Sequence, residues 1–462
     1  MASRSRRWAL ALIVVTFALL LVISRAYGGA TPPPRAPLDV EWRVPVGCGF
    51  SGFFTEVALG FVPALLDGDR FADDGLRVVL LCGQCSEGFL RTALEPRAAA
   101  AIRRAWADEA TRAASLTARS VVIEHGDPCG MRRWSSQSRP RWVISRTMSE
   151  GDPTAEAVRC LRGADEVWVP TAWHVEAYAA AGVERRRLLA VPEPVDVDFF
   201  APDSDAKPRA PFVFFSNFKW EARKGWDLLL EAYWSAFTKS DGVRLLLKTY
   251  LPSWEAGPPD LNLHVEAFAR QLGKRRGDLA PVELHVDEST SRGALAEMYR
   301  GADAFVLPTR GEGWGLPIAE AMASGLPVIA TNFSGPTAFL TDDNSYPLRV
   351  ARRLPGGQAE PSVADVAQAM KRVREKPAEA RRKGERARAD MAAKFSSHVV
   401  AAAARARLEQ IRRELEAGGA SPPGQTASAA GERDELRRRR LASSRFLVPG
   451  RNSKKFSGRL VS

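Results

Sequence analysis

The chain has few of the side chains that most often bind transition metals. It contains five histidines and five cysteines among its 462 residues. The histidines are scattered, and no His/Cys spacing matches that of a zinc site. We therefore expect no zinc centre.

The few cysteines are confined to the first half of the chain, at Cys48, Cys82, Cys85, Cys129 and Cys160. Cys82 and Cys85 have the spacing of a redox pair, but no thioredoxin-like context surrounds them, so a local bridge or buried thiols are favoured. An oxidising compartment would permit one or two disulfides in this half, with one thiol left over.

Acidic residues are in deficit. The chain has 66 Lys and Arg against 54 Asp and Glu, a formal charge of +12. A basic chain can bind polyanions, so nucleic acid has to be considered as a partner. Much of the excess lies in the terminal segments, and the interior carries a pattern typical of nucleotide chemistry, so we expect no nucleic-acid partner.

One N-terminal segment is apolar, from Trp8 to Ile23, and Arg4, Arg6 and Arg7 precede it. Positive charge before an apolar span predicts a cytosolic N-terminus and a body across the membrane. We expect residues 1–30 to form a cytosolic stub and signal-anchor helix of a type II membrane protein in the endoplasmic reticulum or Golgi. Cleavage and secretion are the alternative, although no clean Ala-x-Ala site follows.

The remainder divides by composition into five segments. These are a proline-rich stem (31–44), a first α/β domain (45–202), a linker (203–211), a second α/β domain (212–416) and a basic, disordered tail (417–462). In each domain short apolar runs alternate with longer helical stretches, which predicts parallel strands with crossover helices. The predicted strands include 78–81, 121–123, 167–169, 189–191, 212–215, 245–247, 284–286, 304–307 and 328–330.

The segment from Gly301 to Gly325 predicts a ligand site. It contains a strand, a glycine-rich loop with Gly311, Gly313 and Gly315, and a helix that begins near Pro317. Glycines let the backbone approach a bulky ligand, and the N-terminus of a helix suits a diphosphate.

Two acids lie in that segment, Glu312 in the loop and Glu320 in the helix. Their E-x7-E spacing within EGWGLPIAEAMASGLPVIA resembles the signature of the retaining glycosyltransferase family 4, also called glycosyl transferases group 1. A second match is upstream, where Lys219 and then Lys224-Gly225 follow a strand. The family's usual arginine is matched here by Lys219, which supplies charge without bidentate geometry.

The resemblance implies the GT-B fold: two Rossmann-like, doubly wound domains that face a cleft. It also implies roles for particular residues. Lys219 and Lys224 would hold the donor diphosphate, Glu312 would face the sugar, and Glu320 would accept the ribose hydroxyls. The remaining predicted site residues are Gly313, Trp314, Gly315 and Leu316 around the helix N-terminus, Gly52 in an N-terminal glycine-rich loop, and His125 near the sugar, where a purely structural histidine is an equal alternative.

The predicted function is transfer of a hexose, with retention, from a nucleoside-diphosphate sugar to a hydroxyl of a glycan, lipid or protein. No cofactor or metal is expected, because lysines and a helix terminus take the metal's place. Asp196-Val-Asp198 resembles a metal-binding DxD motif but precedes the linker, so we reject it. Asn332-Phe-Ser334 is a glycosylation sequon that we expect to be unmodified. A catalytically inactive glycan- or nucleotide-binding protein of the same fold is the alternative.

Overall fold

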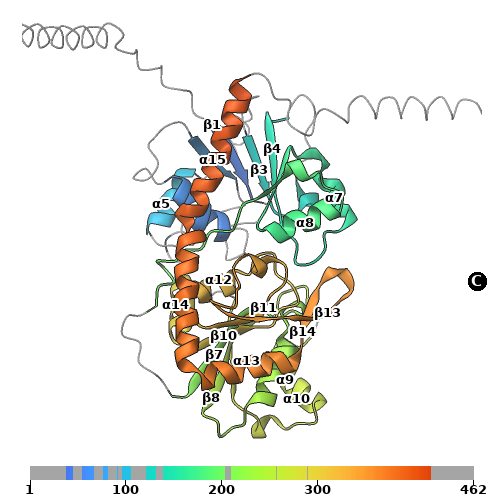
Figure 1. Cartoon of the computed structure of the whole chain (residues 1–462), viewed down its shortest axis with the longest axis vertical. Helices are drawn as coiled ribbons and strands as arrows, with labels where there is room; N and C mark the ends of the chain where they lie inside the picture. The colour runs from blue at the N-terminus through green and yellow to red at the C-terminus, as the bar shows by residue number, and fades with distance from the viewer. Residues whose placement is uncertain are drawn as a thin grey trace, which may run out of the picture.

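The computed structural model consists of two α/β domains, one above the other (Figure 1). It describes residues 38–44, 55–66, 76–81, 91, 96–105, 121–131, 139–202, 210–255, 257–288 and 290–417. The predicted signal-anchor (1–30), the glycine-rich loop with Gly52, most of the linker (203–209) and nearly all of the tail (418–462) lie outside the described residues. Within these ranges, no helix combines the length and apolar character needed to cross a bilayer.

The N-terminal domain is built on a six-stranded parallel sheet with the order β2-β1-β3-β4-β5-β6. Its strands are β1 (Leu38–Arg43), β2 (Leu76–Leu81), β3 (Val121–His125), β4 (Trp142–Arg146), β5 (Glu166–Val169) and β6 (Leu188–Ala190). Its helices are η1 (Glu56–Phe61), α3 (Val62–Leu65), α5 (Pro96–Ala105), η2 (Pro128–Gly130), α7 (Ala155–Cys160), η3 (Leu161–Gly163), α8 (Ala172–Ala180) and η4 (Arg185–Arg187).

The C-terminal domain is built on a second six-stranded parallel sheet, with the order β12-β11-β10-β7-β8-β9. Its strands are β7 (Phe212–Lys219), β8 (Val243–Tyr250), β9 (Val282–Val286), β10 (Ala304–Leu307), β11 (Val328–Thr331) and β12 (Tyr346–Leu348). Its principal helices are α9 (Trp226–Ala236), α10 (Leu261–Gln271), α11 (Arg292–Arg300), α12 (Leu316–Ala323), α13 (Val363–Glu375) and α14 (Pro377–Lys394), with short turns η5 (Ala222–Lys224), η6 (Arg276–Asp278), η7 (Gly335–Ala338) and η8 (Pro355–Gly357). A two-stranded antiparallel hairpin, β13 (Val350–Arg353) and β14 (Ala359–Pro361), projects from this domain.

The strand order places a crevice where the sequence predicted a ligand. Strands β8 and β9 lie on one side of β7, and β10 to β12 lie on the other. In such sheets ligands bind beyond the carboxyl ends of the strands, where the order reverses. The carboxyl ends of β7 and β10 are therefore the expected binding edge. The predicted pair of doubly wound domains, as in the GT-B fold, is confirmed.

Each of the predicted strands is present, and the central ones are buried on both faces of a parallel sheet. In β10 all four residues are buried, and in β3 all five are. Strands β1, β4, β12, β13 and β14 were not predicted. In β1 the charged residues Asp39, Glu41 and Arg43 interrupt the apolar pattern, although Glu41 is itself buried beside Arg43.

Two boundaries differ from the predicted ones. Residues 38–43 form β1 in the middle of the first sheet, so the domain begins inside the segment predicted as stem. The last helix, α15 (Ser397–Glu416), returns to the N-terminal domain, where Val400, Ala404 and Leu408 join its core. Figure 1 shows α14 along the lower domain and α15 along the upper one. An amphipathic pattern shows that a helix buries one face but not which domain receives it.

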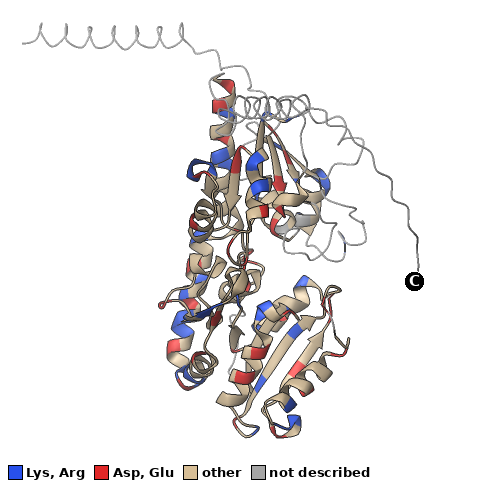
Figure 2. Cartoon of the chain, turned by 90° about the vertical axis from the view of Figure 1, so that its right-hand side faces the viewer, with Lys and Arg blue, Asp and Glu red and all other residues tan. Residues whose placement is uncertain are grey.

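One disulfide joins Cys129 to Cys160 and links η2 to the end of α7. It is one of the one or two disulfides that the sequence would permit in this half of the chain, while Cys48, Cys82 and Cys85 lie beyond the described ranges. In the view of Figure 2, Lys and Arg are interspersed with Asp and Glu over both domains.

The return of α15 generates a stability prediction. Leu408 is fully buried against the N-terminal domain, so Leu408→Ala should lower the free energy of unfolding by about 2–5 kcal/mol. Gln410→Ala, on the exposed face of the same helix, is the matched control and should change it by less than about 0.5 kcal/mol. Urea denaturation measures both. Equal, small effects would show that α15 does not complete the N-terminal core.

Candidate active site

The candidate site is assembled from two segments at the carboxyl edge of the second sheet. Lys219 is the last residue of β7, and η5 carries Lys224 just beyond it. Strand β10 leads into the loop with Glu312, which ends at the start of α12. Because β7 and β10 are neighbours in the sheet, residues far apart in the sequence meet at this edge.

The centre of the site is an ion pair between Lys224 and Glu312. Lys224 Nζ lies 2.8 Å from both carboxylate oxygens of Glu312. Arg223 Nη1 adds a second cation 3.6 Å from Oε2 of Glu312 and donates to the carbonyl of Gly311 at 2.8 Å. Lys224 and Glu312 are 8% and 5% exposed. Burial alone would raise the pKa of Glu312, but the charges of Lys224 and Arg223 outweigh it and hold that pKa below its usual value.

The backbone of Glu312 is fixed from a third segment. Its N–H donates to Oγ of Ser334 at 3.0 Å, and the Ser334 hydroxyl donates back to its carbonyl at 2.8 Å. The N–H of Gly335 also donates to that carbonyl, at 3.0 Å. Ser334 has a left-handed backbone, with φ of 55°, a conformation that costs free energy outside glycine and occurs often at functional sites. The predicted sequon therefore includes a residue that positions the acid.

The loop glycines occupy positions where a side chain would be strained or crowded. Gly315 caps the N-terminus of α12 with φ of 100°, which a side chain would strain. A Cβ at Gly313 would collide with the sulfur of Met148, and one at Gly311 with the carbonyl of Glu150. Both partners belong to the loop after β4, so the N-terminal domain packs directly on the acid's loop. An ion pair of 3.0 Å between Asp152, also after β4, and Arg353 of β13 adds a further contact between the two domains.

Glu320 lies one turn into α12, as predicted, and is buried. The Tyr299 hydroxyl donates to its Oε2 at 2.9 Å. Burial raises the pKa of Glu320 to about 7, although the Tyr299 hydrogen bond and the charges of Arg292 and Lys248 act against the shift. Near neutral pH, its carboxyl group is thus present in both the protonated and the ionised form.

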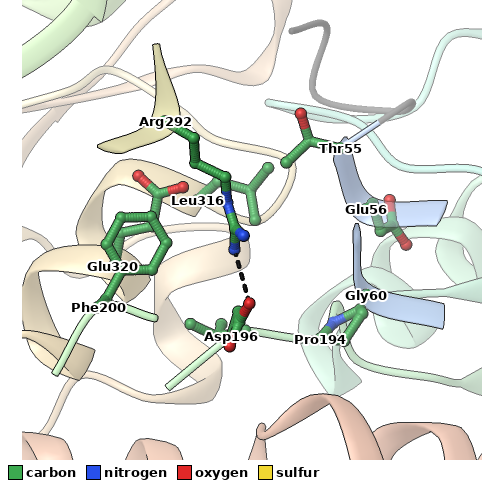
Figure 3. A pocket seen from close by; sticks show the side chains of 10 residues that line it. Thr55, Glu56, Gly60, Pro194, Asp196, Phe200, Arg292, Leu316 and Glu320 are labelled. Carbon is green, nitrogen blue, oxygen red and sulfur yellow. Dashed lines mark hydrogen bonds and ion pairs between the residues drawn. The ribbon is translucent and has the colours of Figure 1, made fainter. Parts of the chain in front are cut away.

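Glu320 faces a pocket that spans the two domains (Figure 3). The pocket is partly open, and about 310 Å³ of empty space lies within it, open solvent included. Arg292 reaches into it and donates to Asp196 Oδ2 at 3.0 Å. Its walls are Thr55, Glu56, Gly60, Pro194, Val195, Asp196, Phe200, Arg292, Leu316 and Glu320.

Two of the predicted donor residues make side-chain contacts that the sequence did not predict. The Lys219 ammonium lies over the ring of Trp254, 4.8 Å from its centroid, whereas Lys224 and Arg223 contact Glu312. The Trp314 ring is buried in the domain core between Phe339 and Phe395, with centroids 5.0 and 5.3 Å away. Only the backbone of Trp314 can therefore serve a ligand at this loop.

His125 ends β3 in a buried cluster of the N-terminal domain. Trp42 Nε1 donates to its Nδ1 at 3.2 Å, which leaves the ring proton on Nε2, 3.0 Å from Oε2 of Glu56. Burial lowers the pKa of His125 despite the nearby Glu56 charge, so the ring is neutral at pH 7. Arg146 Nε donates to the other oxygen of Glu56 at 2.6 Å. Glu56 lines the pocket and connects this cluster to it.

The sequence reasoning missed Arg223, Ser334 and Tyr299. The position of Arg223 next to Lys224 was a usable signal, but nothing in the sequence tied Ser334 or Tyr299 to the two acids. In the part of the chain that the structure describes, no group of three or more His, Cys, Asp and Glu side chains could hold a metal ion. Asp196, of the rejected DxD motif, accepts hydrogen bonds from Arg292 and the N–H of Phe199.

The C-terminal domain matches a known family. The model of the family described as glycosyl transferases group 1 matches residues 209–376, a range that contains Lys219, Lys224, Glu312 and Glu320. The resemblance inferred from these motifs is thereby confirmed for this domain.

Curated relatives match over part of their length. The D-inositol 3-phosphate glycosyltransferase of Xylanimonas cellulosilytica is 32% identical over 178 residues, which are 35% of this chain and 39% of that protein. The mannosylfructose-phosphate synthase of Agrobacterium fabrum is 29% identical over 162 residues, 33% of this chain and 34% of that protein. The matched part of the chain thus spans well under two thirds of the relatives' length.

Solved structures share the two-domain fold. The sucrose-phosphate synthase of Thermosynechococcus elongatus superposes with a TM-score of 0.58 at 18% identity, over 83% of this chain and 100% of that one. Anabaena HepE, solved with UDP and glucose, superposes with a TM-score of 0.53 at 14% identity, over 82% of this chain and 100% of that one. At these identities the comparison concerns the fold alone.

The buried ion pair generates a prediction for stability. Removing either partner leaves an uncompensated buried charge, so Lys224→Met and Glu312→Gln should each lower the free energy of unfolding by up to about 3–5 kcal/mol. The double variant removes both charges and should cost less than the sum of the two single changes. Chemical denaturation of the four proteins gives the coupling free energy. A coupling near zero would mean that the two groups do not interact in solution.

Proposed function

We propose that this chain is a retaining, metal-independent hexosyltransferase that uses a nucleoside-diphosphate sugar and a hydroxyl-bearing glycan, lipid or protein acceptor. The observation that carries the proposal is the ionised, buried Glu312 held by Lys224 beside the N-terminus of α12. The family match of this domain and the names of its relatives, which include a glycosyltransferase, support the reaction class. The solved complex of HepE with UDP and glucose supports a nucleotide-sugar as donor.

Each group has a role in this proposal. Lys224, with Arg223 and the N-terminus of α12, stabilises the negative charge that develops on the diphosphate as the sugar departs. Glu312 faces the donor sugar. There its carboxylate accepts hydrogen bonds from the sugar hydroxyls and stabilises positive charge at the anomeric carbon. Glu320 accepts hydrogen bonds from the two ribose hydroxyls in the pocket of Figure 3. Lys219 leaves Trp254 to reach the diphosphate.

The transfer step conserves atoms and charge without a cofactor. The bond from the anomeric carbon to the phosphate oxygen breaks, and the acceptor oxygen forms a new bond to that carbon from the same face. The proton of the acceptor hydroxyl passes to the leaving phosphate. Lysine, arginine and a helix terminus supply the positive charge that a metal ion supplies in other transferases, which is why we propose metal independence.

We also propose that the domains work in an oxidising compartment of the secretory route, held by the N-terminal signal-anchor, or secreted if that segment is cleaved. The Cys129–Cys160 disulfide supports this placement, because disulfides persist in oxidising compartments.

A protein of the same fold that binds nucleotides without catalysis is the second candidate. The pairing of both Glu312 oxygens with Lys224 favours this second candidate, because a lysine that neutralises the acid can have a purely structural role. The deciding experiment incubates the full-length protein with UDP- and GDP-sugars and measures slow donor hydrolysis. Binding without hydrolysis or transfer would establish the second candidate.

A replacement of Glu312 tests its role in the reaction. Glu312→Gln should reduce donor hydrolysis and transfer by at least about 10²-fold, since it removes the carboxylate that meets developing charge, while nucleoside-diphosphate binding persists. Glu283→Gln, at a half-exposed acid on β9 that pairs with Arg244, is the control and should keep wild-type turnover. Near-normal turnover of the folded Glu312 variant would remove this acid from the mechanism.

Glu320 makes nucleotide affinity depend on pH. Its raised pKa of about 7 means that the carboxylate is present above that pH and is lost as the pH falls through it. Between one pH unit above and one below, the Kd for UDP or GDP should rise about tenfold. Glu320→Gln should bind the nucleotide weakly at both pH values. The pH dependence that comes from Glu320 should be lost, so that only the titration of the nucleotide's own phosphate remains. Calorimetric titration at the two pH values measures both proteins; identical pH profiles would contradict the ribose assignment.

A further inference from the structure

Glu193 is a buried acid with an unsatisfied oxygen. It follows β6 and directly precedes Pro194, which lines the pocket between the domains. Its side chain is 2% exposed, and its Oε1 has no hydrogen-bond partner among the residues that the structure describes. Buried polar groups in native proteins are nearly always paired, so such an atom needs a physical explanation.

The backbone around Glu193 is held firmly. Arg146, at the carboxyl end of β4, donates to the carbonyls of Val191 at 2.8 Å and Pro192 at 3.3 Å. The same guanidinium binds Glu56. Arg146 is thus occupied by Glu56 and two carbonyls, and Glu193 is held next to this cluster without a bond from it.

Charges of both domains act on Glu193. Burial, the carboxylate of Glu56 and, from the other side of the cleft, the carboxylate of Glu312 raise its pKa well above the usual value, and Arg146 opposes them only in part. His125, which lies behind Glu56, is neutral. The raised pKa favours the protonated form of Glu193, and a protonated carboxyl group can donate one hydrogen bond and accept others.

Glu193 belongs to the N-terminal domain and directly precedes a residue of the pocket wall, Pro194. In Figure 3, Glu56 and Pro194 lie on the side of the pocket opposite Glu320. In the proposed function, the donor occupies the C-terminal side, with its sugar at Glu312 and its ribose at Glu320. A molecule that approaches the donor sugar from the N-terminal domain meets the wall that contains Glu56 and Pro194, and Glu193 directly precedes Pro194 in the chain.

We propose that the carboxyl group of Glu193 binds a hydroxyl of the acceptor that neighbours the reacting hydroxyl, so that the acceptor is a sugar or another polyol. This inference rests on the proposed function and narrows its acceptor class. The carboxyl O–H of Glu193 donates a hydrogen bond to this hydroxyl. The hydroxyl in turn donates a hydrogen bond to Oε1, so the buried oxygen gains a partner. The reacting hydroxyl still gives its proton to the leaving phosphate, so Glu193 positions the acceptor and takes no part in proton transfer.

The test uses the full-length protein, a UDP- or GDP-sugar donor that it hydrolyses, and a panel of methyl glycosides as acceptors. Glu193→Ala should raise the KM for the best methyl glycoside about tenfold or more, the effect of losing a buried hydrogen bond, with donor hydrolysis and nucleotide Kd unchanged. Glu193→Gln keeps a donor and an acceptor group, so its KM at neutral pH should stay close to that of the wild type.

The pH profile separates positioning from mere packing. In the wild type, the acceptor KM should rise as the pH climbs through the pKa of Glu193, because the carboxyl group loses its proton. Glu193→Gln should abolish this alkaline rise and should also raise the Tm at alkaline pH, since no charge is then buried among Glu56 and Glu312.

The outcomes are distinguishable. An unchanged acceptor KM in Glu193→Ala, an alkaline rise that persists in Glu193→Gln, or absence of transfer to every methyl glycoside while donor hydrolysis continues would overturn the role of Glu193 alone. Failure of the wild type to bind or hydrolyse any nucleotide-sugar would instead overturn the proposed function and this inference with it.

Discussion

The ion pair between Lys224 and Glu312 is the constraint on which the rest of the site depends. A buried carboxylate in a glycine-rich loop is costly unless a cation lies against it, and here both oxygens lie 2.8 Å from the same ammonium. The pair joins the segments after β7 and β10, so the reversal of strand order at that point is what brings them together. Ser334 and Arg223 then fix the backbone on either side of the acid.

Three carboxyl groups around the cleft differ in protonation because their surroundings differ. Two cations lower the pKa of Glu312, burial brings the pKa of Glu320 to about 7, and burial with two neighbouring carboxylates raises the pKa of Glu193. Groups of one chemical type can thereby serve as a charge stabiliser, a titratable acceptor and a hydrogen-bond donor within one cleft. Their separate roles come from placement on different elements, since all three are glutamates.

The sequence predicted the second domain well because its signals are local. The strand from Ala304 to Leu307, the helix after Gly315 and the spacing of Glu312 and Glu320 lie within one continuous segment. Contacts between distant segments were not predictable: Ser334 reaches Glu312 from another loop, α15 crosses to the first domain, and Trp314 turns its ring into the core. The first domain was harder because β1 and β4 mix charged with apolar residues, and the sequence motif around Glu193 shows no feature of a ligand site.

In the proposed function, the pair of Lys224 and Glu312 marks the place where a donor's diphosphate and sugar meet. The most direct measurement is a crystal structure of the protein with a bound nucleoside-diphosphate sugar. We predict that the phosphate oxygens lie against Lys224 and the N-terminus of α12, the ribose hydroxyls on Glu320, and the sugar beside Glu312. A nucleotide bound elsewhere, or one whose phosphates lie away from Lys224 and α12, would contradict it.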